Sequence, residues 1–166
     1  MRPPTATRFP TRRKIRLPLP VYCEGHAFLV TIGAAKRFPW FRVHPTAADL
    51  VVTVLSETAR SRASALYAWC VMPDHVHLLL EDGDIVEFIR LFKGRAASAV
   101  RRLACDRTLW QRSFYDHGLR REESVDRVAQ YIFENPVRAD LVASPQDYLW
   151  SGSNVWPEWR QGYGRG

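Results

Sequence analysis

The stretch YAWCVMPDHVHLLLE, residues 67–81, contains two apolar segments separated by a Met-Pro-Asp sequence. A Pro-Asp pair is typical of turns, so the stretch predicts a β-hairpin with strands at about 67–71 and 75–81. Residues two apart in a strand point to the same face of the sheet. We therefore expect His75 and His77 side by side on one face, with the aliphatic residues that alternate with them on the other.

Two interpretations of this histidine pair are open. Two imidazoles on a rigid strand can bind a divalent metal together. They can also be half-exposed sheet residues without a ligand. The apolar flanks of residues 75–81 indicate a central strand, where imidazoles that face the core without a ligand would be costly.

The composition indicates one globular domain with a basic surface. The chain has 166 residues, of which 46% are hydrophobic, and a net charge of +7. This charge favours a polyanionic partner, nucleic acid first, although many basic proteins bind none. No apolar run is long enough to span a bilayer, and none follows the basic N-terminus as in a signal peptide. The three cysteines form no CxxC motif, so we expect reduced thiols in a cytoplasmic protein.

The order of the predicted elements indicates the fold class. A strand at 28–32, a helix from Thr46, the hairpin, a helix at 85–104, a strand at 110–117 and a helix from about 122 to Asn135 follow one another. This β-α-β-β-α-β order predicts an α+β, ferredoxin-like (split βαβ) fold. We expect an antiparallel sheet with two helices on one face and the histidine pair on the open face. Pro136 is expected to end the last helix.

Three regions are predicted along the chain. Residues 1–20 form a basic, proline-rich arm, which is either a disordered tail or a segment that follows a phosphate backbone. Residues 21–143 form the domain. Residues 144–166 form an irregular, tryptophan-containing tail that either packs on the domain or frays.

Tyr131 and Asn135 lie four apart on the last predicted helix and therefore share a face. Both can be ordinary residues of an amphipathic helix. Alternatively, the amide oxygen of Asn135 completes a metal site with the histidine pair, and the Tyr131 hydroxyl acts as a nucleophile. A phenol has an ordinary pKa of about 10, and a nearby cation would stabilise the phenolate for attack on a phosphodiester.

Three motifs in this order, MPDHVHLLL (72–80), WQRSFYDH (110–117) and YIFENPVRA (131–139), resemble the single-tyrosine HUH transposases of the IS200 type. They are most similar to the REP-associated tyrosine transposase branch. The resemblance implies that His75, His77 and Asn135 bind Mg²⁺ or Mn²⁺, although imidazole ligands also suit Zn²⁺. It implies that Tyr131, on a C-terminal helix, cleaves and transfers single-stranded DNA through a covalent 5′-phosphotyrosine.

The resemblance also implies the partners. The substrate would be single-stranded DNA that forms hairpins beside palindromic repeats, bound by a monomer or a homodimer, with no membrane and no small-molecule substrate. Candidate DNA contacts are Arg12 and Arg13 in the arm, Lys93 and Arg95 on the second long helix, and His117.

Two other functions fit the same residues. One is a non-catalytic nucleic-acid-binding module, because ferredoxin-like sheets also stack bases on exposed aromatic side chains. The other is a metallohydrolase that uses water as the nucleophile and would not require Tyr131. Like the transposase hypothesis, both of these functions require a phosphodiester ligand that binds on the sheet.

Overall fold

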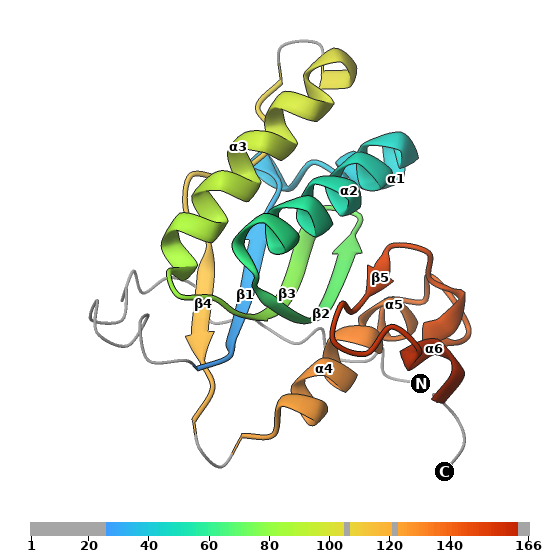
Figure 1. Ribbon diagram of the computed structural model, residues 1–166. Helices are drawn as coiled ribbons and strands as arrows, with labels where there is room; N and C mark the ends of the chain where they lie inside the picture. Colours follow the sequence, from blue (N-terminus) through green and yellow to red (C-terminus); the bar gives the residue numbers. More distant parts are fainter. Residues whose placement is uncertain (1–25, 105–106, 121–122, 163–166) are drawn as a thin grey trace.

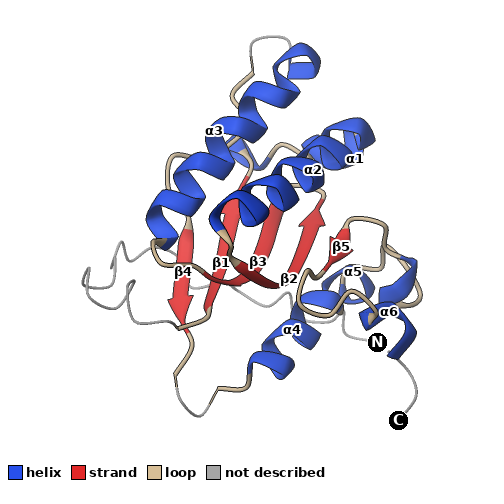
Figure 2. Cartoon of the chain, in the orientation of Figure 1, coloured by secondary structure: helices blue, strands red, loops and turns tan. Residues whose placement is uncertain are grey.

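The computed structural model describes residues 26–104, 107–120 and 123–162, so Arg12 and Arg13 of the predicted arm lie outside the described residues. Figures 1 and 2 show the arrangement of the elements. Their bounds are β1 Phe28–Gly33, η2 Ala35–Arg37, α1 Trp40–Val43, α2 Pro45–Arg62, β2 Ala65–Met72, β3 His75–Glu81, α3 Ile85–Ala104, β4 Tyr115–Gly118, α4 Val125–Phe133, α5 Asn135–Arg138, η3 Pro145–Asp147, β5 Ser151–Gly152 and α6 Trp159–Gly162.

The five strands form one antiparallel sheet in the order β4-β1-β3-β2-β5. The first four strands have the order of a ferredoxin-like sheet, which confirms the predicted α+β fold. β3 lies in the centre and pairs with β1 on one side and β2 on the other. The hairpin between β2 and β3 confirms the turn predicted from the Pro-Asp pair.

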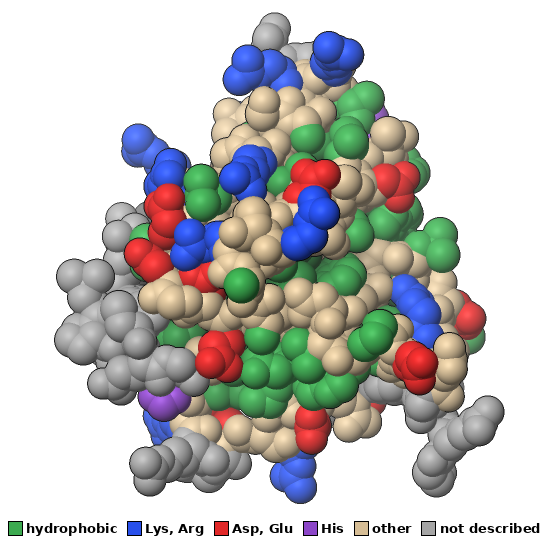
Figure 3. Space-filling view, in the orientation of Figure 1, with side chains coloured by type: hydrophobic (Ala, Val, Ile, Leu, Met, Phe, Trp, Pro, Cys, Tyr) green, Lys and Arg blue, Asp and Glu red, His purple; other side chains and the backbone are tan. Residues whose placement is uncertain are grey.

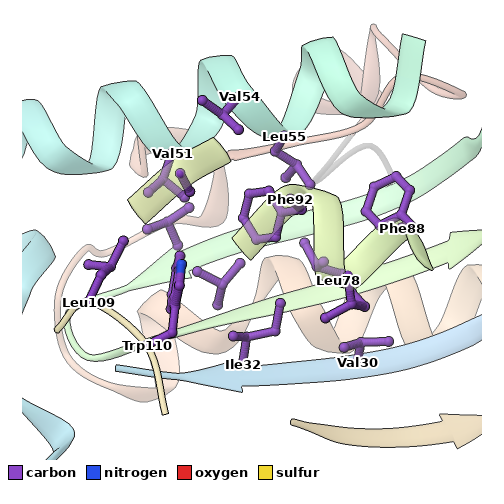
Figure 4. Close-up of a cluster of buried hydrophobic side chains, with 14 of the residues drawn as sticks. Val30, Ile32, Val51, Val54, Leu55, Leu78, Phe88, Phe92, Leu109 and Trp110 are labelled. Atoms are coloured by element: carbon purple, nitrogen blue, oxygen red, sulfur yellow. The ribbon is translucent and has the colours of Figure 1, made fainter. Parts of the chain in front are cut away.

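One face of the sheet packs against α2 and α3, and Figure 4 shows the side chains at this interface. Side chains from the central strands meet aliphatic side chains of α2 and aromatic side chains of α3. The helical spacing of these residues is what predicted both helices. Asp84 caps α3 as expected, because its Oδ1 accepts a hydrogen bond from the backbone N–H of Glu87 at 3.0 Å. The labelled residues of this core are Val30, Ile32, Val51, Val54, Leu55, Leu78, Phe88, Phe92, Leu109 and Trp110.

The other face of the sheet is only partly open. Ala129, Ile132 and Phe133 of α4 form a second buried cluster with residues of β2 and β3. The expectation of an uncovered face is therefore wrong over the central strands, since α4 is amphipathic and buries its apolar side there. Figure 1 shows α4 on the side of the sheet opposite to α2 and α3.

Three segments differ from the sequence-based expectation. Pro136 does not simply end the last helix: α4 stops at Phe133, and Pro136 lies in the first turn of the short helix α5, where a missing N–H does no harm.

The fourth strand is shorter than the predicted 110–117. Trp110 makes only an isolated bridge to Ala34, and its side chain is buried in the core.

The segment after α5 is more regular than the predicted tail. Residues 151 and 152 add β5 to the edge of the sheet beside β2. The Tyr148 side chain is buried, and its hydroxyl donates a hydrogen bond to the carbonyl of Val71 at 2.7 Å. The Trp159 ring stacks on Phe133 with ring centroids 3.9 Å apart. Within the described residues, none of the helices is both long and apolar enough to cross a membrane.

Candidate active site

His75 and His77 stand side by side on the face of the sheet that α4 partly covers. The register pairs His77 with Thr31 of β1 and Cys70 of β2, and pairs His75 with Gly33 and Met72. Directly paired residues in a ladder share a face, and Cys70 belongs to the cluster under α4. This confirms the predicted alternation, with Val76 and Leu78 buried on the opposite face.

The hydrogen bonds of the two imidazoles make their Nε2 atoms converge. His75 Nδ1 lies 2.6 Å from Oδ1 of Asp74, and His77 Nδ1 lies 2.9 Å from Oγ1 of Thr31. The two Nε2 atoms are 3.0 Å apart. Where the carboxylate of Asp74 or the hydroxyl of Thr31 accepts from Nδ1, Nε2 is the ring nitrogen that can bind a metal. Both rings are therefore oriented to present Nε2 to a common point.

The electrostatic environment keeps His77 neutral and Asp74 charged. Burial, followed by the positive charges of His75, Arg138 and Arg37, lowers the pKa of His77 to about 3. Burial alone would raise the pKa of Asp74, but hydrogen bonding to His75 and the charges of His75 and Arg37 hold it below its ordinary value. Arg37 Nε lies 3.0 Å from Oδ2 of this carboxylate. Neutral imidazole is the form that binds a metal.

Asn135 and Tyr131 lie at the junction of α4 and α5, on the same side of the sheet as the histidine pair. The last carbonyls of a helix lack intrahelical donors, and Pro136 has no N–H to offer the carbonyl of Ile132. Asn135 Nδ2 fills this need, donating to the carbonyls of Tyr131 at 3.1 Å and Ile132 at 3.4 Å. The nitrogen end of the amide is thus held by the helix, and Oδ1 faces away from these carbonyls.

The phenol of Tyr131 is accessible. The residue is 38% exposed, and its backbone carbonyl accepts hydrogen bonds from Asn135 Nδ2 and Arg138 Nη2. The charge of Arg138, which contacts Tyr131 through the ring and the carbonyl, also lowers the pKa of His77 after burial and the charge of His75. Arg138 thus contacts Tyr131 and lies near enough to the histidine pair for its charge to act on His77.

The other predicted site residues are not all near this pair. Lys93 and Arg95 lie on α3, on the opposite face of the sheet. The Lys93 ammonium donates to the carbonyls of Gln111 at 2.7 Å and Arg112 at 3.1 Å, and burial lowers its pKa. It thereby holds the segment that leads to β4, while Arg95 is exposed.

His117 shares the face of the histidine pair but lies at its edge. It is on β4 and pairs with Leu29 of β1, which in turn pairs with Leu79 of β3. Its Nε2 lies 3.0 Å from Oε2 of Glu123, so the ring connects β4 to the start of α4. His117 therefore has a local partner, and its strand β4 is separated from β3 by β1.

Four residues around the pair did not emerge as candidates from the sequence. Thr31 and Asp74 orient the imidazoles, Arg37 pairs with Asp74, and Arg138 contacts Tyr131. Only Asp74 was indicated by the sequence, because it directly precedes His75. Thr31 becomes a partner only through the pairing of β1 with β3, which no local pattern gives.

The chain was compared with known proteins. The model of the family described as "Transposase IS200 like" matches residues 28–135, a span that contains the histidine pair, Tyr131 and Asn135. The chain belongs to the IS200-like transposase family. The matched span also covers β1 to α4 and so includes the whole of the four-stranded ferredoxin-like sheet.

The relatives of this transposase support the predicted branch. A REP-associated tyrosine transposase of Escherichia coli (strain K12) is 24% identical over 135 residues, covering 78% of each chain. A solved structure of a REP-associated tyrosine transposase bound to a REP hairpin superposes with a TM-score of 0.68 and 21% identity. It covers 84% of this chain and 82% of that chain. The predicted resemblance to the REP-associated branch is confirmed.

The donor set of this transposase also limits what it could bind. Among residues 26–104, 107–120 and 123–162, no group of three or more His, Cys, Asp or Glu side chains is arranged to hold a metal ion. A metal at His75 and His77 would therefore need ligands outside this set, such as water or an amide oxygen.

The pKa of His77 gives a pH-dependent prediction. Because the folded pKa is about 3 and the unfolded value is about 6.5, the unfolded chain binds a proton that the folded chain does not. His77 therefore reduces the free energy of unfolding progressively as the pH falls below about 6.5. In ¹⁵N NMR of the metal-free protein, the His77 ring should remain neutral from pH 8 to pH 5. The same ring in urea-unfolded protein is the control, and protonation of folded His77 near pH 6 would contradict the analysis.

Proposed function

We propose that this transposase cleaves and transfers single-stranded DNA with the help of a divalent metal, through a covalent 5′-phosphotyrosine at Tyr131. The observation that carries the proposal is the pair of Nε2 atoms, 3.0 Å apart, with both Nδ1 atoms engaged by other groups. The two Nε2 atoms lie within hydrogen-bonding distance of each other, and a divalent cation bound by both would replace that hydrogen bond.

The protein ligands of Mg²⁺ or Mn²⁺, the metals that the resemblance implies, would be the Nε2 atoms of His75 and His77 together with Oδ1 of Asn135. All three ligands are neutral, so the positive charge of the metal would remain available to polarise a phosphodiester.

In the proposed reaction, each of these residues would have a separate role. Asp74 and Thr31 hold the imidazoles, and the buried setting keeps His77 unprotonated. The Tyr131 oxygen bonds to phosphorus, the bond from phosphorus to the 3′ oxygen breaks, and a free 3′-OH remains. The phosphotyrosine retains the energy of the phosphodiester, which allows a 3′-OH to reverse the step and rejoin DNA.

We propose a hairpin-forming strand beside palindromic repeats as the substrate. One structural relative is bound to a REP hairpin, and the net charge of +7 favours any DNA backbone. Figure 3 shows Lys and Arg side chains over α3, where Arg101 and Arg102 lie in the last turn. Arg95 and these two arginines would contact the duplex stem rather than the cleaved phosphate, because α3 lies across the sheet from His77. The Lys93 ammonium already donates to two backbone carbonyls and would contact DNA only if it left them. Arg12, Arg13 and His117 stay candidate contacts.

Tyr115 supports a nucleic-acid-binding role with or without cleavage. It pairs with Thr31, which pairs with His77, so the three share one face of the sheet. Tyr115 is 55% exposed, and an exposed aromatic ring on such a sheet can stack a base. A non-catalytic binding module would use this surface alone and would need neither the metal nor Tyr131.

A denaturing gel with a labelled single-stranded hairpin and Mn²⁺ separates these functions. Tyr131→Phe removes only the nucleophilic oxygen, so the covalent protein–DNA band should disappear while the binding affinity stays within about twofold. His75→Ala should abolish the band by loss of the metal. Cleavage that persists in Tyr131→Phe would indicate a hydrolase, and hairpin binding without a covalent band in the wild type would indicate a binding module.

Thr31→Val tests the hydrogen bond that orients His77. Valine has nearly the same shape as threonine but cannot accept from Nδ1, so Mn²⁺ affinity measured by calorimetry should fall about 10-fold or more. Thr53→Val is the matched control, since Thr53 is exposed on α2 and bonds only within its helix. Equal Mn²⁺ affinity of Thr31→Val and the wild type would count against His77 as a ligand.

A further inference from the structure

We infer that Arg37 binds a backbone phosphate of the single strand, next to the phosphate that would be cleaved at the histidine pair. The position of this contact relative to the cleaved bond rests on the proposed function. The contact between the guanidinium and a DNA phosphate does not, and it can be tested by binding measurements without a metal.

The guanidinium of Arg37 is anchored at one end and accessible at the other. Its Nε lies 3.0 Å from Oδ2 of Asp74, and the Arg37 side chain is 56% accessible. This ion pair occupies one of the five N–H donors of the guanidinium. It leaves the two Nη groups, at the tip of an accessible side chain, as a planar pair of donors. Such a pair can bind two oxygens of one phosphate.

Asp74 places this guanidinium beside the proposed metal site. Its other oxygen, Oδ1, lies 2.6 Å from Nδ1 of His75, so the carboxylate lies between Arg37 and the imidazole. The atom of His75 that faces His77 is the other ring nitrogen, Nε2. A carboxylate and the width of a ring therefore separate the guanidinium from a metal on Nε2. Arg37 would meet a neighbouring phosphate of the strand rather than the one that the metal polarises.

The backbone that carries Arg37 is strained. Lys36 and Arg37 have φ angles of 54° and 55°, in the left-handed region that residues with a β-carbon rarely adopt. Such conformations persist only where the surrounding structure determines them, and they cluster at ligand-binding segments. The two residues lie in the short segment between β1 and α1, so their conformation decides where the Arg37 side chain leaves the sheet.

Two backbone hydrogen bonds join this segment to the turn between β2 and β3. The N–H of Ala34 donates to the carbonyl of Asp74 at 2.8 Å, and the N–H of Phe41 donates to the carbonyl of Pro73 at 3.1 Å. The residues that flank Arg37 on both sides are thus tied to the turn that carries its ion-pair partner. A guanidinium held in this way loses less freedom on binding a phosphate than an arginine on a free side chain.

Further cations lie close to Arg37. Lys36 precedes it and is exposed. Arg107 is also exposed, and its Cζ lies 4.9 Å from the centroid of the Phe38 ring, one residue beyond Arg37. A single strand carries one negative charge per nucleotide, so several cations at one edge of a site favour the passage of its backbone there.

Binding of a labelled hairpin with a single-stranded flank, measured by fluorescence anisotropy in EDTA, tests the inference without cleavage. Arg37→Gln should bind about 10-fold more weakly, because it loses a charge-assisted contact. The slope of log affinity against log salt concentration should become shallower by about 0.7. Arg37→Lys, which keeps the charge but not the planar fork, should lie between Arg37→Gln and the wild type.

Arg90→Gln is the matched control for these measurements. Arg90 is also an accessible arginine that pairs with a carboxylate, but it lies on α3, across the sheet from the histidine pair. Its removal should leave the affinity within about twofold of the wild type. Equal affinities of Arg37→Gln and Arg90→Gln would overturn the inference. Thermal unfolding verifies that each variant is folded, which is expected because an accessible ion pair contributes little to stability.

A methylphosphonate scan of the oligonucleotide locates the phosphate. Each oligonucleotide carries one neutral methylphosphonate in place of one phosphate of the stem or of the flank. The wild type should lose affinity at one flank position, and Arg37→Gln should lose no more there, because the contact is already absent. The same loss at every position in both proteins, or a dependence on Arg37 that is confined to the stem, would overturn the inference.

The affinity for Mn²⁺ separates phosphate binding from an effect on His75. Arg37→Gln should leave Mn²⁺ affinity in calorimetry within about threefold, because Asp74 keeps its contact with His75. If Arg37 acts only by holding Asp74, the variant would bind Mn²⁺ more weakly and would bind DNA in EDTA as the wild type does. That result would overturn the inference.

The denaturing gel distinguishes a failure of this inference from a failure of the proposed function. Where the wild type forms the covalent band, the phosphate assigned to Arg37 should neighbour the cleaved one, and a more distant position would overturn the inference. A wild type without the band, but with a flank affinity that depends on Arg37, would refute the proposed function and support the phosphate contact. A covalent band together with DNA binding that is independent of Arg37 would refute this inference alone.

Discussion

The pairing of β3 between β1 and β2 is the constraint on which the candidate site depends. Side chains alternate along a strand, so a shift of one residue would move both imidazoles into the apolar layer under α2 and α3. The observed register instead pairs Thr31 with His77 and brings the two Nε2 atoms to 3.0 Å. Apolar side chains such as Val76 and Leu78 favour this register, because it places them in the core under α2 and α3. The core thus fixes the geometry of the polar site on its other face.

The second constraint is the break after α4. A continuous helix would carry Tyr131 and Asn135 on one face, but Pro136 has no N–H to donate to the carbonyl of Ile132. Pro136 starts a new helix, the Asn135 amide caps the old one, and Arg138 returns to Tyr131. One short segment therefore orients an amide oxygen, a phenol and a guanidinium on the same side of the sheet.

The sequence was most informative where the pattern is local. Alternation in residues 75–81 predicted the histidine pair and its face, and helical spacing with Asp84 predicted α3, since both depend on neighbours in the chain. The sequence was least informative for features that depend on contacts between distant parts of the chain. β5 has two residues and no pattern of its own, and Thr31 and Arg138 acquire partners only through strand register and a helix break. The covering of the second face by α4 is likewise a property of the assembled fold.

The central claim is that His75 and His77 together bind a divalent metal in a site beside Tyr131. Pulsed EPR of the Mn²⁺-loaded protein with ¹⁵N-labelled histidine tests this claim most directly, because electron–nuclear couplings report nitrogen ligands one by one. The account predicts coupling to two imidazole nitrogens in the wild type and to one in His77→Ala. A spectrum of Mn²⁺ surrounded only by water oxygens, or two couplings that survive in His77→Ala, would contradict it.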